Sequence, residues 1–266
     1  MNRLIANNVH IVGNGAKTMM MVHGYGCDQH VWDLVLPEFV NDHRIVLLDL
    51  VGSGGSDVAS YDRKKYATLR GHAADILEIC DELKLGEVTY VGHSVAAMIG
   101  VLAALARPAQ FSELVMVAPS PSYINSDGYV GGFTRADIDG LLDFLELNYL
   151  GWADKMAPAI MGVPDRPQLA ADLAASFCRN DPAIAKHFGR VTFLSDHRED
   201  VKKLTKECLI LQCTDDLLAP PVVGRWLQRN LARSTLVELF ATGHSPHVSA
   251  PQETAAAMQR FLAGRV

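Results

Sequence analysis

Short apolar runs alternate along this chain with segments whose apolar residues recur every three or four positions. Near-continuous apolar runs, rich in valine, isoleucine and leucine, are typical of strands in a parallel sheet that is covered on both faces. Six such runs predict strands: 18–22, 44–50, 88–91, 114–118, 208–213 and 236–240.

The segments between these runs show helical spacing, and helices are predicted at 68–85, 95–106, 220–231 and 252–262. Gly86 is placed to end the first of them as a C-terminal cap. Residues 95–106 are small and apolar all round, as in a helix buried beside a sheet. The alternation predicts a doubly wound, mostly parallel α/β sheet, with residues 4–12 as an antiparallel edge hairpin.

One interval breaks this rhythm. Ala118 and Cys208 are 90 residues apart (208 − 118), whereas a simple crossover needs roughly ten to thirty residues. Four helices are predicted inside it, at 134–149, 152–161, 167–178 and 182–194, with Thr134 and Asp181 as N-caps and Pro182 in a first turn. We therefore expect a four-helix lid at 122–194, inserted before the fifth strand of the six, over a core of 1–121 and 195–266 in a single domain.

The segment Gly92-His93-Ser94-Val95-Ala96 lies between a predicted strand and a predicted helix. A sharp strand-to-helix turn exposes the serine hydroxyl of a hydrolase, usually as G-x-S-x-G, and here alanine takes the last place. Ser94 is thus the candidate nucleophile, and the helix beginning at Val95 directs amides towards it. His93 is expected to serve packing, because a residue adjacent to the nucleophile in such a turn points away from it.

Two further loops follow predicted strands. His23-Gly24-Tyr25-Gly26 follows the first strand, where this fold class supplies an oxyanion-hole amide, so the N–H groups of Tyr25 and Val95 are the candidates. His23 is expected to be structural.

The α/β-hydrolase chain order is serine, aspartate, histidine, each after a strand. Asp215 and Asp216 follow run 208–213, while His244 and His247 follow run 236–240. Both loops lie at carboxyl ends of strands, where ligands bind in open α/β sheets. Spacing alone does not choose within either pair.

Composition narrows the possible partners. The net charge of −6 argues against nucleic acid, and no run approaches the eighteen or so apolar residues of a membrane span. Five scattered cysteines without a CxxC pair favour reduced thiols, and no secretory leader pattern is visible, so a cytoplasmic protein is expected. The ten histidines show no zinc spacing, so no metal and no cofactor are predicted.

Several motifs together resemble one family, that of the bacterial stress-response regulator RsbQ and the plant strigolactone and karrikin receptors. The motifs are HGYGCDQ (23–29), LDLVGSGGSD (48–57), GHSVAAM (92–98), APSPSY (118–123), GGF (131–133), QCTDD (212–216) and GHSPH (243–247). The likeness spans nearly the whole chain.

This resemblance implies that Asp216 and His244 are the catalytic members of their pairs. It also implies a V-shaped four-helix lid over a deep apolar pocket. The residues at or near lining positions are Tyr123, Phe133, Trp152, Met156, Phe177, Phe193 and Leu218. Met156 stands where relatives often carry an aromatic residue.

The expected function is cleavage of a small apolar ester or lactone by a serine hydrolase. The alternative is a ligand-sensing receptor with slow turnover, which recruits a protein partner through its lid. Hydrolysis of a carbon–carbon bond would suit the same three residues. The sequence does not choose, because the triad is present in each case.

Overall fold

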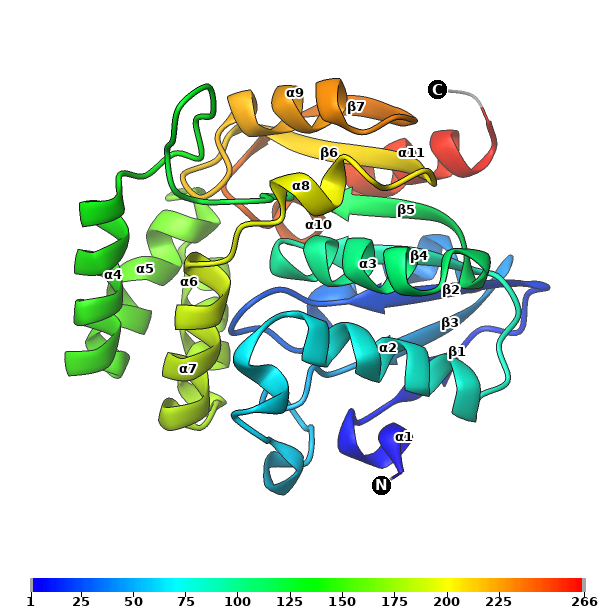
Figure 1. Cartoon of the computed structure of the whole chain (residues 1–266), viewed down its shortest axis with the longest axis horizontal. Coiled ribbons are helices and arrows are strands. Elements are labelled where there is room, and N and C mark those ends of the chain that lie inside the picture. The colour runs from blue at the N-terminus through cyan, green and yellow to red at the C-terminus, as the bar shows by residue number, and fades with distance from the viewer. Residues whose placement is uncertain (1, 265–266) are drawn as a thin grey trace.

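A seven-stranded sheet forms the centre of the molecule (Figure 1). The computed structural model describes residues 2–264. The strand order is β1-β3-β2-β4-β5-β6-β7, in which only β1 runs antiparallel to its neighbour. The strands are β1 His10–Val12, β2 Lys17–Val22, β3 His43–Leu48, β4 Val88–His93, β5 Phe111–Val117, β6 Glu207–Asp215 and β7 Ser234–Thr242. The six predicted strands and the mostly parallel α/β class are confirmed.

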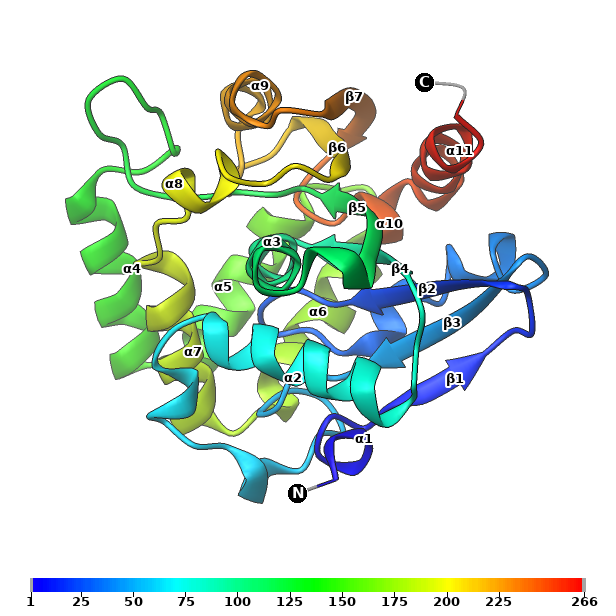
Figure 2. The same ribbon diagram turned by 45° about the vertical axis from the view of Figure 1, so that its right-hand side comes forward.

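Helices cover both faces of the sheet, because successive strand residues point to opposite sides. Met20 and Val22 of β2 belong to the hydrophobic cluster on one face of the sheet, which α2 (Arg70–Glu82), α3 (Val95–Ala106) and α9 (Pro221–Asn230) cover. Met19 and Met21 pack on the other side with α11 (Pro251–Leu262). Figure 2 shows α2 and α3 on one side of the sheet and α11 on the other. The inner strands β2 to β6 are therefore mostly buried on both faces, as their apolar runs predicted, whereas the edge strands β1 and β7 are partly exposed.

Two local predictions were wrong: Gly86 as a helix cap and residues 4–12 as a hairpin. Helix α2 ends in a turn centred on Lys84, at φ 51°, with the Leu85 amide donating to the Cys80 carbonyl at 2.9 Å. This hydrogen bond closes the helix, so Gly86 is not its cap.

Residues 4–12 do not form a hairpin. The Asn2 side chain accepts hydrogen bonds from the amides of Leu4 and Ile5 and so caps a one-turn helix, α1 (Arg3–Ala6). Only β1 joins the sheet, pairing antiparallel with β3. Local capping by one asparagine thus replaced the first expected strand.

Four helices lie between β5 and β6 and gather at one end of the sheet (Figure 1). They are α4 (Arg135–Leu147), α5 (Tyr149–Met161), α6 (Pro167–Arg179) and α7 (Pro182–Phe193). Thr134 forms a capping box with Asp137, and the Asp181 carboxylate accepts from the amides of Ala183 and Ile184. These helices pack around a hydrophobic cluster of their own. A one-turn helix, α8 (Arg198–Val201), leads from them into β6, and within residues 2–264 no helix is long and apolar enough to cross a bilayer.

Two histidines are buried without a hydrogen bond to either ring nitrogen, His72 and His247. His72 stacks on Tyr66 at 4.5 Å between ring centroids, and His247 lies 4.5 Å from Trp32. Burial removes the water that would stabilise a charged imidazole, and it is the main reason that the pKa of each is lowered to about 3. Unfolded histidine has a pKa of about 6.5. Between pH 6.5 and 3 these two histidines are therefore protonated in the unfolded chain but neutral in the folded protein. The free energy of unfolding decreases as the pH falls through this range.

We predict that lowering the pH from 7.5 to 5.5 reduces the free energy of unfolding by about 1.4 kcal/mol for each of these two histidines. His72→Phe removes one of them and should make the decrease smaller by about that amount. Urea unfolding of wild type and variant at both pH values measures the difference. His30→Gln, at an exposed site, is the control and should keep the wild-type decrease. An unchanged decrease in His72→Phe would contradict the assignment.

Candidate active site

Ser94 occupies the sharp turn between β4 and α3, with φ 56° and ψ −123°. Non-glycine residues rarely adopt a positive φ. The Ser94 amide donates to the Val117 carbonyl at 2.8 Å, which ties the turn to β5. A Cβ on Gly92 would lie 2.6 Å from the Ala96 carbonyl oxygen, so the turn requires glycine there. Alanine at position 96 is compatible with the turn.

Three buried side chains form a hydrogen-bonded chain. The Ser94 Oγ lies 2.7 Å from His244 Nε2, and His244 Nδ1 lies 2.8 Å from Asp216 Oδ2 and 3.0 Å from Oδ1. Asp216 Oδ1 also accepts from the amides of Leu218 and Ala219, at 2.9 and 3.0 Å. These bonds fix the carboxylate, which in turn holds the imidazole with Nε2 towards the serine.

The structure separates the members of each ambiguous pair. The Asp215 side chain is exposed at the end of β6, and its carbonyl accepts from the Gly243 amide at 2.7 Å. His247 stacks against Trp32 and makes no hydrogen bond through its ring. Only Asp216 and His244 of the two pairs are in the chain of hydrogen bonds that reaches Ser94.

The other two histidines near the site support its loops. His93 Nε2 donates to the His244 carbonyl at 2.8 Å, and burial lowers the pKa of His93 well below its usual value, so this ring is neutral. His23 Nδ1 donates to the Gly24 carbonyl at 2.8 Å, while Nε2 accepts from the Leu50 amide at 3.0 Å. His93 thus links the nucleophile turn to the His244 loop, and His23 anchors the loop that carries Tyr25.

The glycine-rich loop after β2 lies against the nucleophile. A Cβ on Gly24 would lie 2.6 Å from His93 Nδ1 and 3.1 Å from the Ser94 Cβ. Tyr25 follows directly. Val95 is the first residue of α3, so its amide has no helical acceptor. The Val95 amide is thus next to Ser94 in the chain, and the Tyr25 amide belongs to the loop whose Gly24 lies against Ser94.

A small cavity lies beside Ser94 and His244. It is lined by Tyr25, Cys27, His93, Ser94, Tyr123, Ile160, Leu173, Phe177, Thr192, Phe193, Leu218, His244 and Ser245. Its free volume is about 20 Å³, which is room for about one water molecule. Four of the seven predicted lining residues are on its wall: Tyr123, Phe177, Phe193 and Leu218.

The other three, Phe133, Trp152 and Met156, are not on the cavity wall. Trp152 is fully buried behind the wall, with its ring edge against Tyr25 and Phe177 at 6.0 and 5.2 Å. Met156 and Trp152 share a face of α5 with Ile160 at four-residue spacing, and only Ile160 reaches the cavity. Phe133 precedes α4 and is held by its backbone against Tyr123. Phe133 and Met156 are half-buried at the margin of the same hydrophobic cluster.

Sequence reasoning missed five wall residues: Cys27, Ile160, Leu173, Thr192 and Ser245. Leu173 and Phe177 are four apart on the buried face of α6, a spacing that could have suggested the former. The Cys27 thiol is not a second nucleophile, because burial raises its pKa to about 12.

The chain is similar to known proteins over nearly its whole length. A model of the alpha/beta hydrolase family matches residues 19–257. The chain belongs to the alpha/beta hydrolase family. It is 36% identical to the karrikin insensitive 2 receptor CA of Petunia hybrida, over 97% of this chain and 96% of the relative. It is also 36% identical to a strigolactone esterase of Arabidopsis thaliana, over 98% of both chains.

Among solved structures, a hydrolase from Oleispira antarctica superimposes with a TM-score of 0.96 at 37% identity, covering 98% of this chain and 96% of that one. The family fold and the resemblance to strigolactone and karrikin receptors are thus confirmed. The order of Ser94, Asp216 and His244 along the chain is the one that is usual in this family.

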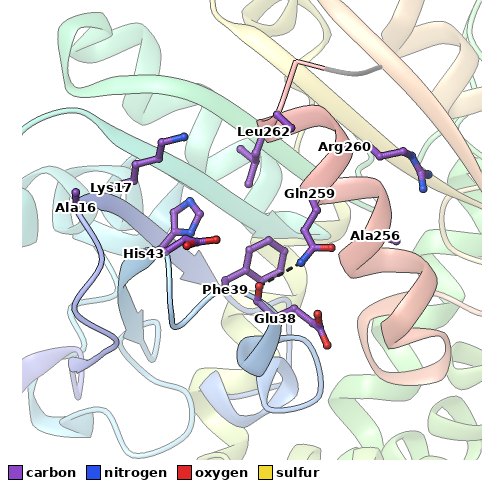
Figure 3. Close-up of a pocket in the computed structure, with 11 residues that line it drawn as sticks. Ala16, Lys17, Glu38, Phe39, His43, Ala256, Gln259, Arg260 and Leu262 are labelled. Atoms are coloured by element: carbon purple, nitrogen blue, oxygen red, sulfur yellow. Dashed lines mark hydrogen bonds between the residues drawn. The ribbon is translucent and has the colours of Figure 1, made fainter.

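A second hollow lies at the other end of the strands, where β2 and β3 begin (Figure 3). Phe39 and His43 line it on one side, while Gln259 of α11 lines the other and donates to the Glu38 carbonyl at 3.2 Å. No predicted site residue lines this groove. In the part of the chain from 2 to 264, no group of three or more histidine, cysteine, aspartate or glutamate side chains is arranged to hold a metal ion.

The aspartate pair gives a direct test of the site. Asp216→Asn should lower kcat for an ester substrate by about 10⁴-fold, because an amide favours the wrong histidine tautomer. Asp215→Asn is the matched control and should retain wild-type kcat, since the Asp215 side chain is exposed. Steady-state kinetics of both variants measure the effect, and reversed losses would refute the assignment of Asp216.

Proposed function

We propose that the protein is a serine hydrolase that cleaves a small apolar ester or lactone. The observation that carries this proposal is the alignment of Ser94 Oγ, the His244 ring and the Asp216 carboxylate through contacts of 2.7 and 2.8 Å. The relatives named as esterases support the same reaction class.

In the proposed mechanism, the Ser94 Oγ attacks the substrate carbonyl while His244 Nε2 accepts its proton. The Asp216 carboxylate stabilises the resulting imidazolium. His244 then returns the proton to the leaving oxygen, and an acyl group remains on Ser94. Water, deprotonated by the same nitrogen, hydrolyses this acyl-enzyme and restores the serine.

The amides of Tyr25 and Val95 would donate hydrogen bonds to the tetrahedral oxyanion. The close approach of Gly24 to Ser94 supports the first, and the position of Val95 at the start of α3 supports the second. Because the backbone fixes both donors, they need no reorganisation as charge develops.

The walls of the cavity favour a small apolar substrate. Tyr123, Phe177, Phe193 and Leu218 surround the nucleophile with apolar surface.

We propose that the chain divides into a core (1–121 and 195–266) and a lid (122–194). Because the free volume is about 20 Å³, wall residues from the lid must move to admit even a small lactone.

A second candidate function is ligand sensing with slow hydrolysis, in which the lid recruits a protein partner after the ligand is bound. Two observations favour it: relatives named as receptors are 36% identical, and Leu147 and Leu150 are exposed at the junction of α4 and α5, by 86% and 61%. We also propose a cytoplasmic location, because the five cysteines are free and thiols stay reduced in that compartment.

We predict that Ser94→Ala lowers hydrolysis of 4-nitrophenyl acetate by several orders of magnitude, because it removes the nucleophile. The melting temperature should stay within a few degrees, since only Oγ is lost. Residual activity above a tenth of wild type would contradict the proposal.

Mass spectrometry of the wild type after incubation with a synthetic butenolide separates the two functions. Rapid turnover without an adduct indicates an enzyme, and one slow event that leaves a modified Ser94 or His244 indicates a receptor.

Phe193 should limit the size of the substrate, since its ring lines the cavity and packs 5.2 Å from Tyr123. Phe193→Ala should raise kcat/KM for 4-nitrophenyl hexanoate relative to acetate by about tenfold. Phe133→Ala, at a position off the wall, is the control and should leave this ratio unchanged. A changed ratio in Phe133→Ala but not in Phe193→Ala would overturn this account of the cavity.

A further inference from the structure

Thr192 carries a buried hydroxyl that has no hydrogen-bond partner among residues 2–264. Its side chain lies on the inner face of α7 with Phe188 and Phe193, and the residue is 1% exposed. The Thr192 carbonyl accepts hydrogen bonds from the amide and the hydroxyl of Ser195, at 3.2 and 2.8 Å. The Thr192 Oγ1, in contrast, makes no hydrogen bond to the protein. Burying a hydroxyl in this way is unfavourable unless something else binds it.

The usual partner of a helical threonine hydroxyl is the carbonyl four residues earlier. Thr254 in α11 follows that rule, donating to the Ala250 carbonyl at 2.9 Å. Thr192 departs from it, although Phe188 stands four residues before it in the same helix. Valine has the same shape as threonine and would bury here without loss, so the packing of α7 alone gives no reason for the hydroxyl.

The position of Thr192 gives the reason. It lies on the wall of the cavity that contains Ser94 and His244. Two other polar groups on that wall are occupied: the Tyr25 hydroxyl donates to the Ala185 carbonyl at 2.9 Å, and His93 Nε2 donates to the His244 carbonyl. His93 Nδ1 is also unpaired, but it belongs to the histidine that holds the His244 loop, whereas Thr192 is on α7. The Thr192 hydroxyl is available to a bound molecule and is separate from the groups that would act on the scissile carbonyl.

We propose that the Thr192 hydroxyl is a specificity-determining group, which selects small esters or lactones that carry a second oxygen atom away from the scissile carbonyl. The inference rests on the proposed function. An ether or carbonyl oxygen accepts the hydrogen bond, and a hydrocarbon of the same shape leaves the buried hydroxyl unpaired. Sites built in this way reject the analogue that lacks the polar atom.

The test uses two pairs of esters that differ by one oxygen in place of a methylene group. The first pair, 4-nitrophenyl methoxyacetate and 4-nitrophenyl butyrate, places the oxygen in the acyl part. The second pair, 4-methoxyphenyl acetate and 4-ethylphenyl acetate, places it in the leaving group. The measured quantity is the ratio of kcat/KM in wild type to kcat/KM in Thr192→Val for each ester, so that intrinsic differences in reactivity between esters cancel.

In at least one pair, Thr192→Val should lower kcat/KM of the oxygen-bearing ester by about three- to tenfold and leave that of the hydrocarbon ester unchanged. Thr192→Ser keeps the hydroxyl and should restore the preference. Thr254→Val, which loses a buried hydrogen bond in α11 at a position off the cavity wall, should affect both members of each pair equally.

Equal effects of Thr192→Val within both pairs would overturn the inference. This outcome is distinct from failure of the proposed function. If the proposed function fails, the wild type hydrolyses none of the esters, or Ser94→Ala retains activity.

Discussion

Ser94 holds a backbone conformation, φ 56° and ψ −123°, which costs on the order of 1–3 kcal/mol and persists only where the surroundings impose it. Here the buried sheet imposes it. Strand β4 lies between β2 and β5, and the Ser94 amide is held by the Val117 carbonyl on β5. On the other side of the turn, α3 packs so closely that position 92 has no room for a side chain. The parallel sheet is thus what keeps the serine poised.

The same burial determines the electrostatics of the site. His93 and His247 lie in contact, with ring centroids 4.4 Å apart, and burial lowers the pKa of both. Because both rings stay neutral at physiological pH, they place no positive charge beside His244 that would oppose its protonation. Asp216 is the carboxylate beside that imidazole, and two backbone amides fix its orientation. Packing and proton transfer therefore depend on the same set of contacts.

Local signals predicted most of this arrangement. The apolar run of β4, the small-residue turn at Ser94 and the apolar helix α3 are contiguous, so the strand-to-helix turn could be predicted from the sequence alone. Spacing could not separate Asp215 from Asp216, because both follow the same strand and only their tertiary contacts differ. Periodicity places Trp152, Met156 and Ile160 on one face of α5. It does not say which layer each one reaches, and two of the three stop short of the cavity.

The small free volume of the cavity beside Ser94 links the two candidate functions. Under the proposed function, a free volume of about 20 Å³ means that wall residues must move when a ligand binds, and six of the thirteen wall residues lie in the segment 122–194. The free energy of that rearrangement opposes ligand binding and must be offset by contacts with the ligand. If the rearranged insertion relaxes as fast as the acyl group is hydrolysed, the protein behaves as an esterase. If hydrolysis is slow, the rearranged surface persists, and with it the exposed junction of α4 and α5 around Leu147 and Leu150. In the proposed mechanism the same Ser94, His244 and Asp216 serve both outcomes, and the lifetime of the acyl-enzyme decides between them.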